Sequence, residues 1–244
     1  EITLRSNRLK TTRDELYKLL ILRKIDCRKG NLEDSIKVKK MTDFKGKLFT
    51  VQDEAAQLAC LKLAAKPDEI VLDACSAPGG KTTYLAEIME NKGEVEAWDI
   101  HPHRVRLVEE AAKKLDISII HAKVHDATIS MPSYKEKFDK ILLDVPCSGL
   151  GVIRKKPDIK WTRKIEDFEE LMSVQEKILD TCSEYLKPGG RMVYSTCTVL
   201  KRENEEQIDR FLLTHSDFTL VEQVKLFPNV DETDGFYIAV LEKK

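Results

Sequence analysis

The sequence predicts an α/β protein built on a doubly wound parallel sheet, preceded by a small α+β unit. Two patterns carry this expectation. From residue 70 onward, apolar segments alternate with segments of helical period, and runs such as Lys-Ile-Leu-Leu at 140–143 suit strands that are buried on both faces. A glycine-rich turn from Asp73 to Lys81 follows the first of these strands and opens a helix, as ligand-binding turns do in such sheets.

Length and charge divide the chain into two units. The 244 residues carry a net charge of −1, but residues 1–50 hold 14 Lys and Arg against 7 Asp and Glu, which leaves 27 of 41 basic and 35 of 42 acidic residues for the remainder. We therefore assign 1–50 to a small basic unit and 51–244 to the main domain. A basic unit on an acidic body is typical of a surface that faces a polyanion, although a solvated helix face explains the charge equally well.

The first unit is expected to contain three short elements. They are a strand over 2–9, an amphipathic helix over 14–24, and a half-exposed strand over 35–40 whose apolar residues alternate with lysines. A unit of this size cannot bury a large core, so we expect it to pack on the main domain. Its residues Arg5, Arg8 and Lys10 form a candidate basic strip.

The main domain opens with a predicted helix over 53–65, capped by Thr50, in whose apolar stripe Cys60 lies. The remaining elements then follow in order. We predict strands over 70–74, 94–99, 118–122, 138–143 and 190–196, helices over 80–90, 102–115, 166–186 and 202–214, and a terminal hairpin from 218–224 and 235–242.

Composition argues against several classes of protein. No apolar run approaches the roughly 20 residues of a membrane helix, so we expect a soluble, cytoplasmic protein. The 6 cysteines are scattered without zinc-binding spacing, which favours free thiols and no metal site. The chain begins with Glu1 rather than Met, as a processed chain or an excised piece of a longer one would.

The glycine-rich turn indicates a nucleotide-like cofactor. Gly79 and Gly80 allow a close approach of the backbone, and the helix that begins there offers free N–H groups. Asp99 closes the next strand 19 residues after Gly80, where a carboxylate binds ribose hydroxyls in related sheets. Neither the dinucleotide fingerprint nor the triphosphate-binding loop is present. An early Asp73 and few glycines fit an adenosyl group that carries an amino acid, which is S-adenosylmethionine.

Two cysteines occupy turn-like peptides at the predicted ends of consecutive core strands, Cys147 in Asp-Val-Pro-Cys and Cys197 in Ser-Thr-Cys. A thiolate that adds to C6 of cytosine makes C5 able to accept a methyl group. An ordinary thiol, with a pKa of ~8.5, is scarcely ionised at neutral pH, so the site must favour the thiolate. Asp144, protonated, is placed to neutralise charge at N3. Buried structural thiols are the alternative, which Cys182 on an apolar helix stripe illustrates.

These peptides together resemble a known family. DACSAPGGKT, AWDI, HDA, LLDVPCSGLG and YSTCT, in this order, are similar to the Sun-type RNA cytosine-C5 methyltransferases, and most to their bacterial ribosomal-RNA branch. The resemblance implies a Rossmann-like S-adenosylmethionine-dependent methyltransferase domain that forms 5-methylcytosine in single-stranded or looped RNA, most readily 16S ribosomal RNA. We expect a monomer, and this chemistry needs no metal. The resemblance also implies that 1–50 binds RNA and that relatives carry a further helical RNA-binding domain.

The resemblance implies individual roles as well. Cys197 would add to C6 and Cys147 would assist release of the product, while Asp144 would contact the cytosine beside Lys81. Ser76 and Thr198 depart from the family pattern without removing a functional group. The cofactor would be bound by Cys75, Ser76, Ala77, Pro78, Gly79, Gly80, Lys81, Asp99, Arg104, Asp126 and Asp144.

A basic stretch over 152–164, with 6 Lys and Arg against a single Asp, would neutralise RNA phosphates at the rim of the site. Trp161 within it could stack on a base, but we favour its packing on its own domain. Three alternatives stay open: a transfer-RNA substrate, a DNA methyltransferase that uses Cys147 as nucleophile, and a non-catalytic cofactor-binding RNA assembly factor.

Overall fold

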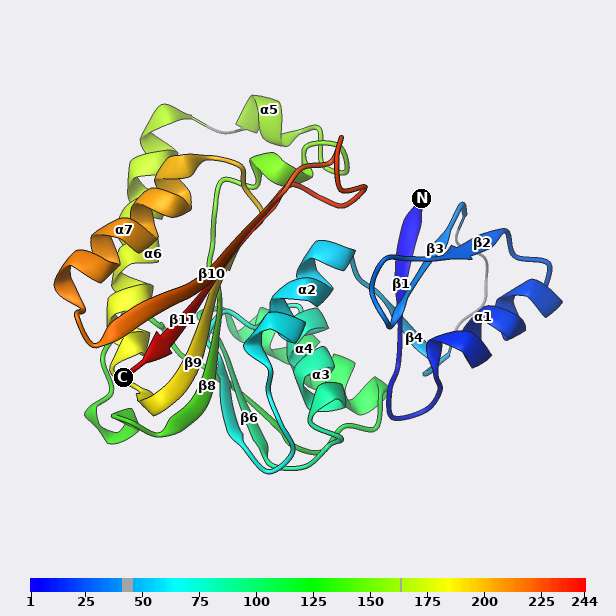
Figure 1. Ribbon diagram of the computed structural model, residues 1–244, viewed down its shortest axis with the longest axis horizontal. Helices are drawn as coiled ribbons and strands as arrows, with labels where there is room; N and C mark the ends of the chain where they lie inside the picture. The colour runs from blue at the N-terminus through cyan, green and yellow to red at the C-terminus, as the bar shows by residue number, and fades with distance from the viewer. Residues whose placement is uncertain (41–45, 163) are drawn as a thin grey trace.

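The computed structural model describes residues 1–40, 46–162 and 164–244. It contains a seven-stranded sheet in the main domain and a separate four-stranded sheet at the N-terminus (Figure 1). The predicted α/β class with a small N-terminal unit is therefore confirmed. No helix within these ranges is long and apolar enough to cross a membrane.

The large sheet has the strand order β10-β11-β9-β8-β5-β6-β7. Strands β5 to β9 pair in parallel with one another. Strand β11 runs antiparallel between β9 and β10, and β10 and β11 form the predicted terminal hairpin. The strands are β5 Ile70–Asp73, β6 Glu94–Asp99, β7 Ile120–Val124, β8 Phe138–Asp144, β9 Leu186–Thr196, β10 Phe218–Leu226 and β11 Phe236–Lys243.

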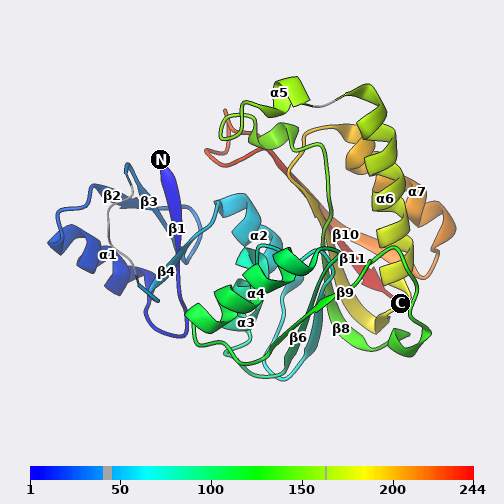
Figure 2. The ribbon, with the colours of Figure 1, turned by 180° about the vertical axis from the view of Figure 1, so that it is seen from behind.

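Helices cover both faces of this sheet (Figure 2). Alternate residues of β8 show why: Leu142 packs into the core beneath α2, α3 and α4, whereas Ile141 and Leu143 pack into the core beneath α6 and α7. The helices are α2 Glu54–Leu63, α3 Gly80–Ile88, α4 Pro102–Lys114, α5 Ile159–Thr162, α6 Ile165–Ser183 and α7 Glu205–Thr214, with 3₁₀ turns η1 Pro132–Tyr134, η2 Leu150–Val152 and η3 Lys201–Glu203.

The N-terminal unit has two strands that the sequence analysis missed. Its sheet has the order β2-β3-β1-β4, and α1 packs against it. The missed strands have three residues each, too few to show a periodic pattern. The elements are β1 Ile2–Ser6, α1 Arg13–Leu22, β2 Cys27–Lys29, β3 Ser35–Val38 and β4 Phe49–Val51.

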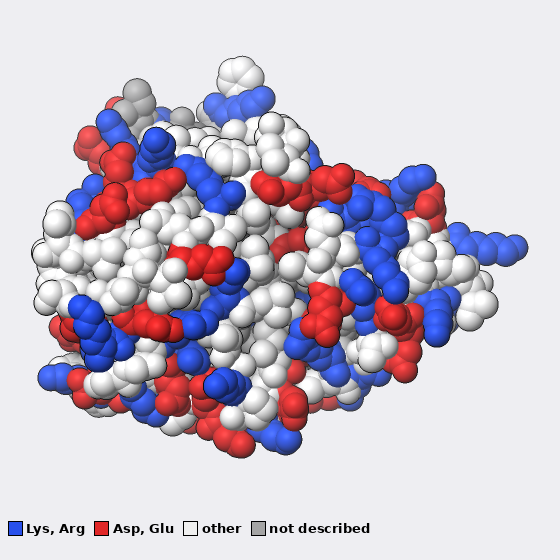
Figure 3. Space-filling model, viewed as in Figure 1, with Lys and Arg blue, Asp and Glu red and all other residues white. Residues whose placement is uncertain are grey.

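Arg5 does not belong to an exposed basic strip, as the sequence analysis had it. Its side chain is 0% exposed and pairs with Glu87 of α3 at 2.7 Å. It also donates to the carbonyl of Gly80 at 2.7 Å, and its guanidinium lies 4.5 Å from the ring centroid of Tyr84. Arg8 likewise pairs with Asp34, and Figure 3 shows acidic side chains beside basic ones over this unit. The unit therefore packs on the helix that carries the glycine-rich turn.

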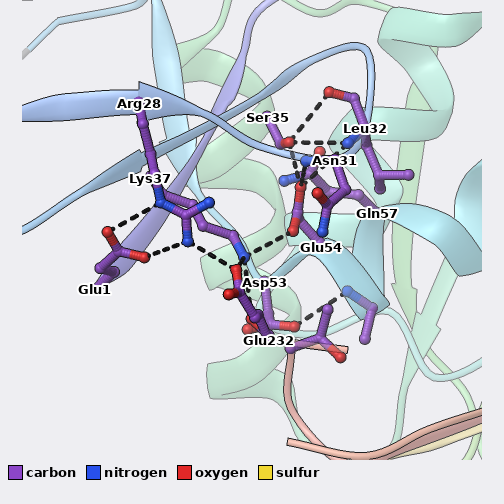
Figure 4. A network of polar contacts seen from close by, with 12 residues as sticks. Glu1, Arg28, Asn31, Leu32, Ser35, Lys37, Asp53, Glu54, Gln57 and Glu232 are labelled. Carbon is purple, nitrogen blue, oxygen red and sulfur yellow. Dashed lines mark hydrogen bonds and ion pairs between the residues drawn. The ribbon is translucent and has the colours of Figure 1, made fainter. Parts of the chain in front are cut away.

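A second buried contact joins the two units through β3, the neighbour of β1. Lys37 of β3 pairs with Glu54 of α2 at 3.2 Å, with side chains 2% and 3% exposed, and Glu54 also accepts from the backbone N–H of Asn31 and Leu32 (Figure 4). The prediction of a half-exposed strand over 35–40 is therefore wrong, because β3 is buried along its whole length. Lys37 can be buried because the carboxylate of Glu54, from the main domain, neutralises its charge.

The cap of α2 also differs from the prediction. Asp53 is the N-cap residue, and its side chain accepts a hydrogen bond from the backbone N–H of Ala55 at 3.0 Å. Thr50, the predicted cap, lies in β4 instead. Cys60 and Cys182 are wholly buried in the core, as predicted.

Candidate active site

The predicted site residues gather at the carboxyl ends of the parallel strands, where open α/β sheets bind their ligands. A cavity of about 470 Å³ lies there. A larger one of about 540 Å³ between α6 and α7 holds none of the predicted residues, so the first is the candidate site. The predicted residues that line it are Cys75, Ala77, Asp99, Arg104, Asp126, Asp144, Cys147 and Cys197.

The other predicted residues of the glycine-rich turn lie behind that lining. Ser76 is buried and donates its hydroxyl to the carbonyl of Trp98 at 2.9 Å. Pro78 follows a cis peptide bond, and Gly79 has φ = 99°, a left-handed conformation that glycine adopts without strain. A Cβ on Gly79 would lie 3.1 Å from Cα of Val108. Because Val108 belongs to α4, the turn lies directly against that helix. Gly80 is the first residue of α3.

Two carboxylates on this side of the cavity are held by neighbouring groups. Arg104 pairs with Asp99 at 3.0 Å and donates to the carbonyl of Ala77 at 3.1 Å, which ties the turn to the end of β6. Asp126 accepts from the backbone N–H and hydroxyl of Thr128, both on Oδ1. With the exposed apolar side chain of Ile100 beside them, these acceptors fit an adenosine, which offers hydroxyl and amino donors and an apolar ring.

The two cysteines face each other from adjacent loops. Sγ of Cys147 lies 3.3 Å from Sγ of Cys197. This hydrogen bond lowers the pKa of Cys197 against the opposing effect of its burial, and the same bond together with burial raises the pKa of Cys147. Either sulfur can donate at this distance, and the opposite directions of the two pKa shifts favour the thiolate at Cys197.

Asp144 lies beside the thiol pair, fixed on both oxygens. Lys81 donates to Oδ2 at 2.5 Å and Ser195 donates to Oδ1 at 2.9 Å. The Lys81 charge also favours the Cys197 thiolate, whereas the Asp144 charge opposes it. Lys81 thus belongs to the glycine-rich turn by sequence but to the cysteine site by its contacts.

A glycine contact closes the loop after Cys147 over the Cys197 loop. Gly151 of η2 donates its N–H to the carbonyl of Cys197 at 2.9 Å, and Gly235 donates to the carbonyl of Gly151 at 2.9 Å. A Cβ built on Gly151 would lie only 1.9 Å from the Gly235 oxygen. The backbones approach so closely that only glycine fits at this position.

Some basic residues of the stretch over 152–164 form ion pairs within the protein. Lys155 bridges Asp53 and Asp234 at 2.7 Å each, and Arg154 approaches Asp234 at 3.5 Å. Trp161 is 88% exposed, so the favoured prediction that it packs on its own domain is wrong. The predicted contribution of Arg163 lies outside the described residues.

Sequence reasoning missed three buried polar residues that support this site: Ser195, Gln175 and Glu203. Ser195 bonds Asp144 directly, and the other two support the cysteine loops from behind. No local pattern marks them, because each acts on residues far away in the chain. Among the described residues, no group of three or more His, Cys, Asp or Glu side chains could hold a metal ion.

Comparison with known proteins identifies the family. The family model described as 16S rRNA methyltransferase RsmB/F matches residues 60–242. The chain belongs to the RsmB/F family. Methyl transfer in such a family implies S-adenosylmethionine as the donor, in agreement with the cofactor predicted from the glycine-rich turn.

Two bacterial relatives show how much of an RsmB/F protein is present. A probable ribosomal RNA small subunit methyltransferase B of Bacillus subtilis is 42% identical over 99% of this chain and 60% of its own length. The ribosomal RNA small subunit methyltransferase B of Shewanella oneidensis is 41% identical over 98% of this chain and 60% of its own. The chain thus spans about 60% of the length of these relatives.

Solved structures share the fold. The crystal structure of PH0851 matches with a TM-score of 0.95 and 33% identity, over 99% of this chain and 59% of that one. A methyltransferase homologue of Pyrococcus horikoshii matches with a TM-score of 0.85 and 28% identity, over 100% of this chain and 86% of that one. The four-stranded N-terminal unit is therefore shared along with the methyltransferase sheet.

Proposed function

We propose that this chain is the catalytic part of an RNA cytosine-C5 methyltransferase that acts on 16S ribosomal RNA through a covalent Cys197–C6 adduct. The observation that carries the proposal is the thiol pair, in which Cys147 lies 3.3 Å from Cys197 and favours its thiolate. An RNA methyltransferase that modifies an amine or a hydroxyl needs no thiol nucleophile. The RsmB/F family supports the ribosomal substrate.

The chemistry follows from the positions of the side chains. The Cys197 thiolate forms an S–C6 bond, and the electron pair of C5=C6 shifts toward N3, where a proton passed from the Lys81 ammonium through the Asp144 carboxylate neutralises it. C5 becomes enamine-like and takes the methyl group, for which S-adenosylmethionine supplies an electrophilic sulfonium carbon. Loss of the C5 proton to solvent then restores C5=C6 and breaks the S–C6 bond, whose electron pair leaves with Cys197 as the thiolate, and N3 returns its proton through Asp144 to Lys81.

Cys147, Lys81 and Ser195 support these steps without forming bonds to the ring. The Cys147 thiol donates to the Cys197 sulfur, so it stabilises the thiolate before attack and again as it leaves. Lys81 and Ser195 hold both oxygens of Asp144 at 2.5 and 2.9 Å, which orients the carboxyl group. The target base must leave its stack to reach these groups, which favours looped or single-stranded RNA.

The direct test measures tritiated methyl transfer from S-adenosylmethionine into small-subunit ribosomal RNA that lacks the modification. Cys197→Ala should abolish label in 5-methylcytosine, and Cys147→Ala should accumulate a protein–RNA adduct because release is impaired. Transfer RNA and matched DNA serve as parallel substrates. Label that persists in Cys197→Ala would refute the nucleophile assignment, and cofactor binding without any label or adduct would support a non-catalytic assembly role.

A further inference from the structure

A buried carboxylate lies behind the Cys147 loop. Glu203, at the end of η3, is 0% exposed. Its Oε1 accepts from the backbone N–H of Ser148 at 2.8 Å and from Nε2 of Gln175 at 3.0 Å, and its Oε2 accepts from the Ser148 hydroxyl at 2.5 Å. Gln175 also donates to the carbonyl of Pro146 at 2.9 Å. Glu203 thus binds the residue after Cys147 directly and the residue before it through Gln175.

The same segment reaches the Cys197 loop. The hydroxyls of Ser148 and Thr198 lie 2.9 Å apart. Asn204, the next residue after Glu203, accepts from the Thr196 hydroxyl at 2.6 Å and donates to the carbonyl of Thr198 at 3.0 Å. Ser148, Thr196 and Thr198 are therefore bonded directly to one buried segment, Glu203–Asn204, and Pro146 is bonded to it through Gln175, which holds the two cysteine loops together.

The charges around the pair are asymmetric. The carboxylate of Glu203 lies on the Cys147 side, whereas the ammonium of Lys81, paired with Asp144, lies on the Cys197 side. In support, the Glu203 charge adds to the rise in the pKa of Cys147 that its bond to Cys197 and its burial cause, whereas the pKa of Cys197 falls through its bond to Cys147, with the Asp144 charge opposing the thiolate and the Lys81 charge favouring it. Glu203 thus disfavours a negative charge on Cys147, while the ion pair of Lys81 and Asp144 places no net charge beside Cys197.

We propose that Glu203 is a positioning residue that selects Cys197, rather than Cys147, as the nucleophile of this enzyme. It holds the Cys147 loop so that the thiol hydrogen faces Cys197, and its negative charge opposes a second charge on Cys147. The inference deepens the proposed function and rests on it for its catalytic meaning. The reactivity of the two sulfurs can nevertheless be measured without RNA or cofactor.

Glu203→Gln removes the negative charge but keeps a side chain of the same size that can form the same hydrogen bonds. The amide oxygen can still accept from the Ser148 N–H and from Gln175. The amide nitrogen can donate to the Ser148 hydroxyl, which then turns its own hydrogen toward Thr198. The loops keep their connection while the charge is lost. Glu203→Asp is the converse variant, which keeps the charge and should largely retain the selectivity of the native protein.

The experiment follows alkylation of the free protein by limiting iodoacetamide between about pH 6 and 9, with peptide mass spectrometry to quantify each cysteine. In the native protein, label should accumulate on Cys197 before Cys147. In Glu203→Gln, the ratio of the two rates should fall about tenfold, which corresponds to a change of one unit in the pKa difference. Cys27, in the N-terminal unit, is the internal reference.

Glu205→Gln is the matched control, because Glu205 lies two residues away but pairs with Lys225 at 2.9 Å. It should leave the ratio unchanged. An unchanged ratio in folded Glu203→Gln would overturn the proposal. If thermal unfolding shows that this variant does not fold, Ser148→Ala replaces it: the Oε2 contact and the link to Thr198 are lost, and an unchanged ratio would again overturn the proposal.

The reactivity test and the methyl-transfer test fail independently. Normal selectivity for Cys197 in a protein that transfers no methyl group would contradict the proposed function but not the role of Glu203. Methyl transfer through Cys197 that survives in Glu203→Gln, with the alkylation ratio unchanged, would contradict the role of Glu203 alone.

Discussion

At the scale of single residues, Asp73, the first residue of the glycine-rich turn, departs from the ordinary chemistry of an aspartate. It is wholly buried at the end of β5, and its carboxyl accepts a hydrogen bond from Thr82 of α3 at 2.7 Å. Burial raises the pKa of Asp73 to about 7. Because the pKa is raised in the folded state, Asp73 stabilises the fold at low pH, and this contribution is lost as the pH rises through 7.

We therefore expect the effect of Asp73→Asn on stability to depend on pH. Asparagine cannot ionise, so its free energy of unfolding does not fall with pH for this reason. Between pH 5 and 8, the free energy of unfolding of the variant should therefore rise by about 3 kcal/mol relative to that of the native protein. Urea unfolding at both pH values measures the difference. Asp126→Asn is the control, because hydrogen bonds from Thr128 lower the pKa of Asp126 and leave it ionised throughout this range. A pH-independent difference for Asp73→Asn would contradict the expectation.

At the scale of elements, α5 carries a large aromatic side chain that contacts with the rest of the protein do not bury. This short helix follows the Cys147 loop and presents Trp161 with 88% of its surface exposed. The neighbouring Lys160 is exposed too, and Figure 1 places α5 above the ends of β9 and β10. An exposed aromatic with basic neighbours suits stacking on an unpaired base of a bound RNA.

Trp161→Ala should accordingly weaken RNA binding without changing stability. Loss of one stacked base costs about 1–3 kcal/mol, or roughly 5- to 150-fold in affinity. The measurement is a binding titration at fixed ionic strength with looped ribosomal RNA, alongside thermal unfolding. Leu213→Ala on α7, also highly exposed at 85%, is the control and should bind normally. Equal affinity of both variants would remove α5 from the RNA-binding surface.

At the scale of the whole molecule, two buried ion pairs join the N-terminal unit to the main domain. Arg5–Glu87 attaches β1 to α3, and Lys37–Glu54 attaches β3 to α2. Removing one partner leaves a charge buried without its counterion, which costs more than replacing both by apolar groups. The unit thus depends on the main domain for the burial and neutralisation of its own basic residues.

Arg5→Met should destabilise the protein by about 3–5 kcal/mol, and the double variant Arg5→Met with Glu87→Met by less than the sum of the two single changes. Urea unfolding of all four proteins gives this coupling. Arg28→Met, which breaks only exposed contacts to Glu1 and Glu232, is the control and should have a far smaller effect. If the changes in the free energy of unfolding for Arg5→Met and Glu87→Met were additive, the ion pair would not stabilise the attachment of the N-terminal unit to the main domain.

Much of the fold and part of the site could be read from local patterns. Apolar runs and helical periods repeat within a few residues, so the succession of strands and helices, the terminal hairpin and the position of the glycine-rich turn were predicted. Three-residue strands and the Asp53 cap were missed because so few residues carry too little periodicity. Cys147, Cys197 and Asp144 could be named because their turns are unusual peptides at strand ends.

The sequence was therefore sufficient for the class of fold and the family, since each depends on side chains close together in the chain, and it also singled out the Cys147, Cys197 and Asp144 turns that the structure brings to one cavity. The partners of Arg5, of Lys37 and of Glu203 were settled only by folding. Arg5 meets Glu87 across 82 residues and Glu203 meets Ser148 across 55. A charge is buried or exposed according to what lies opposite it in space, and local sequence does not contain that information.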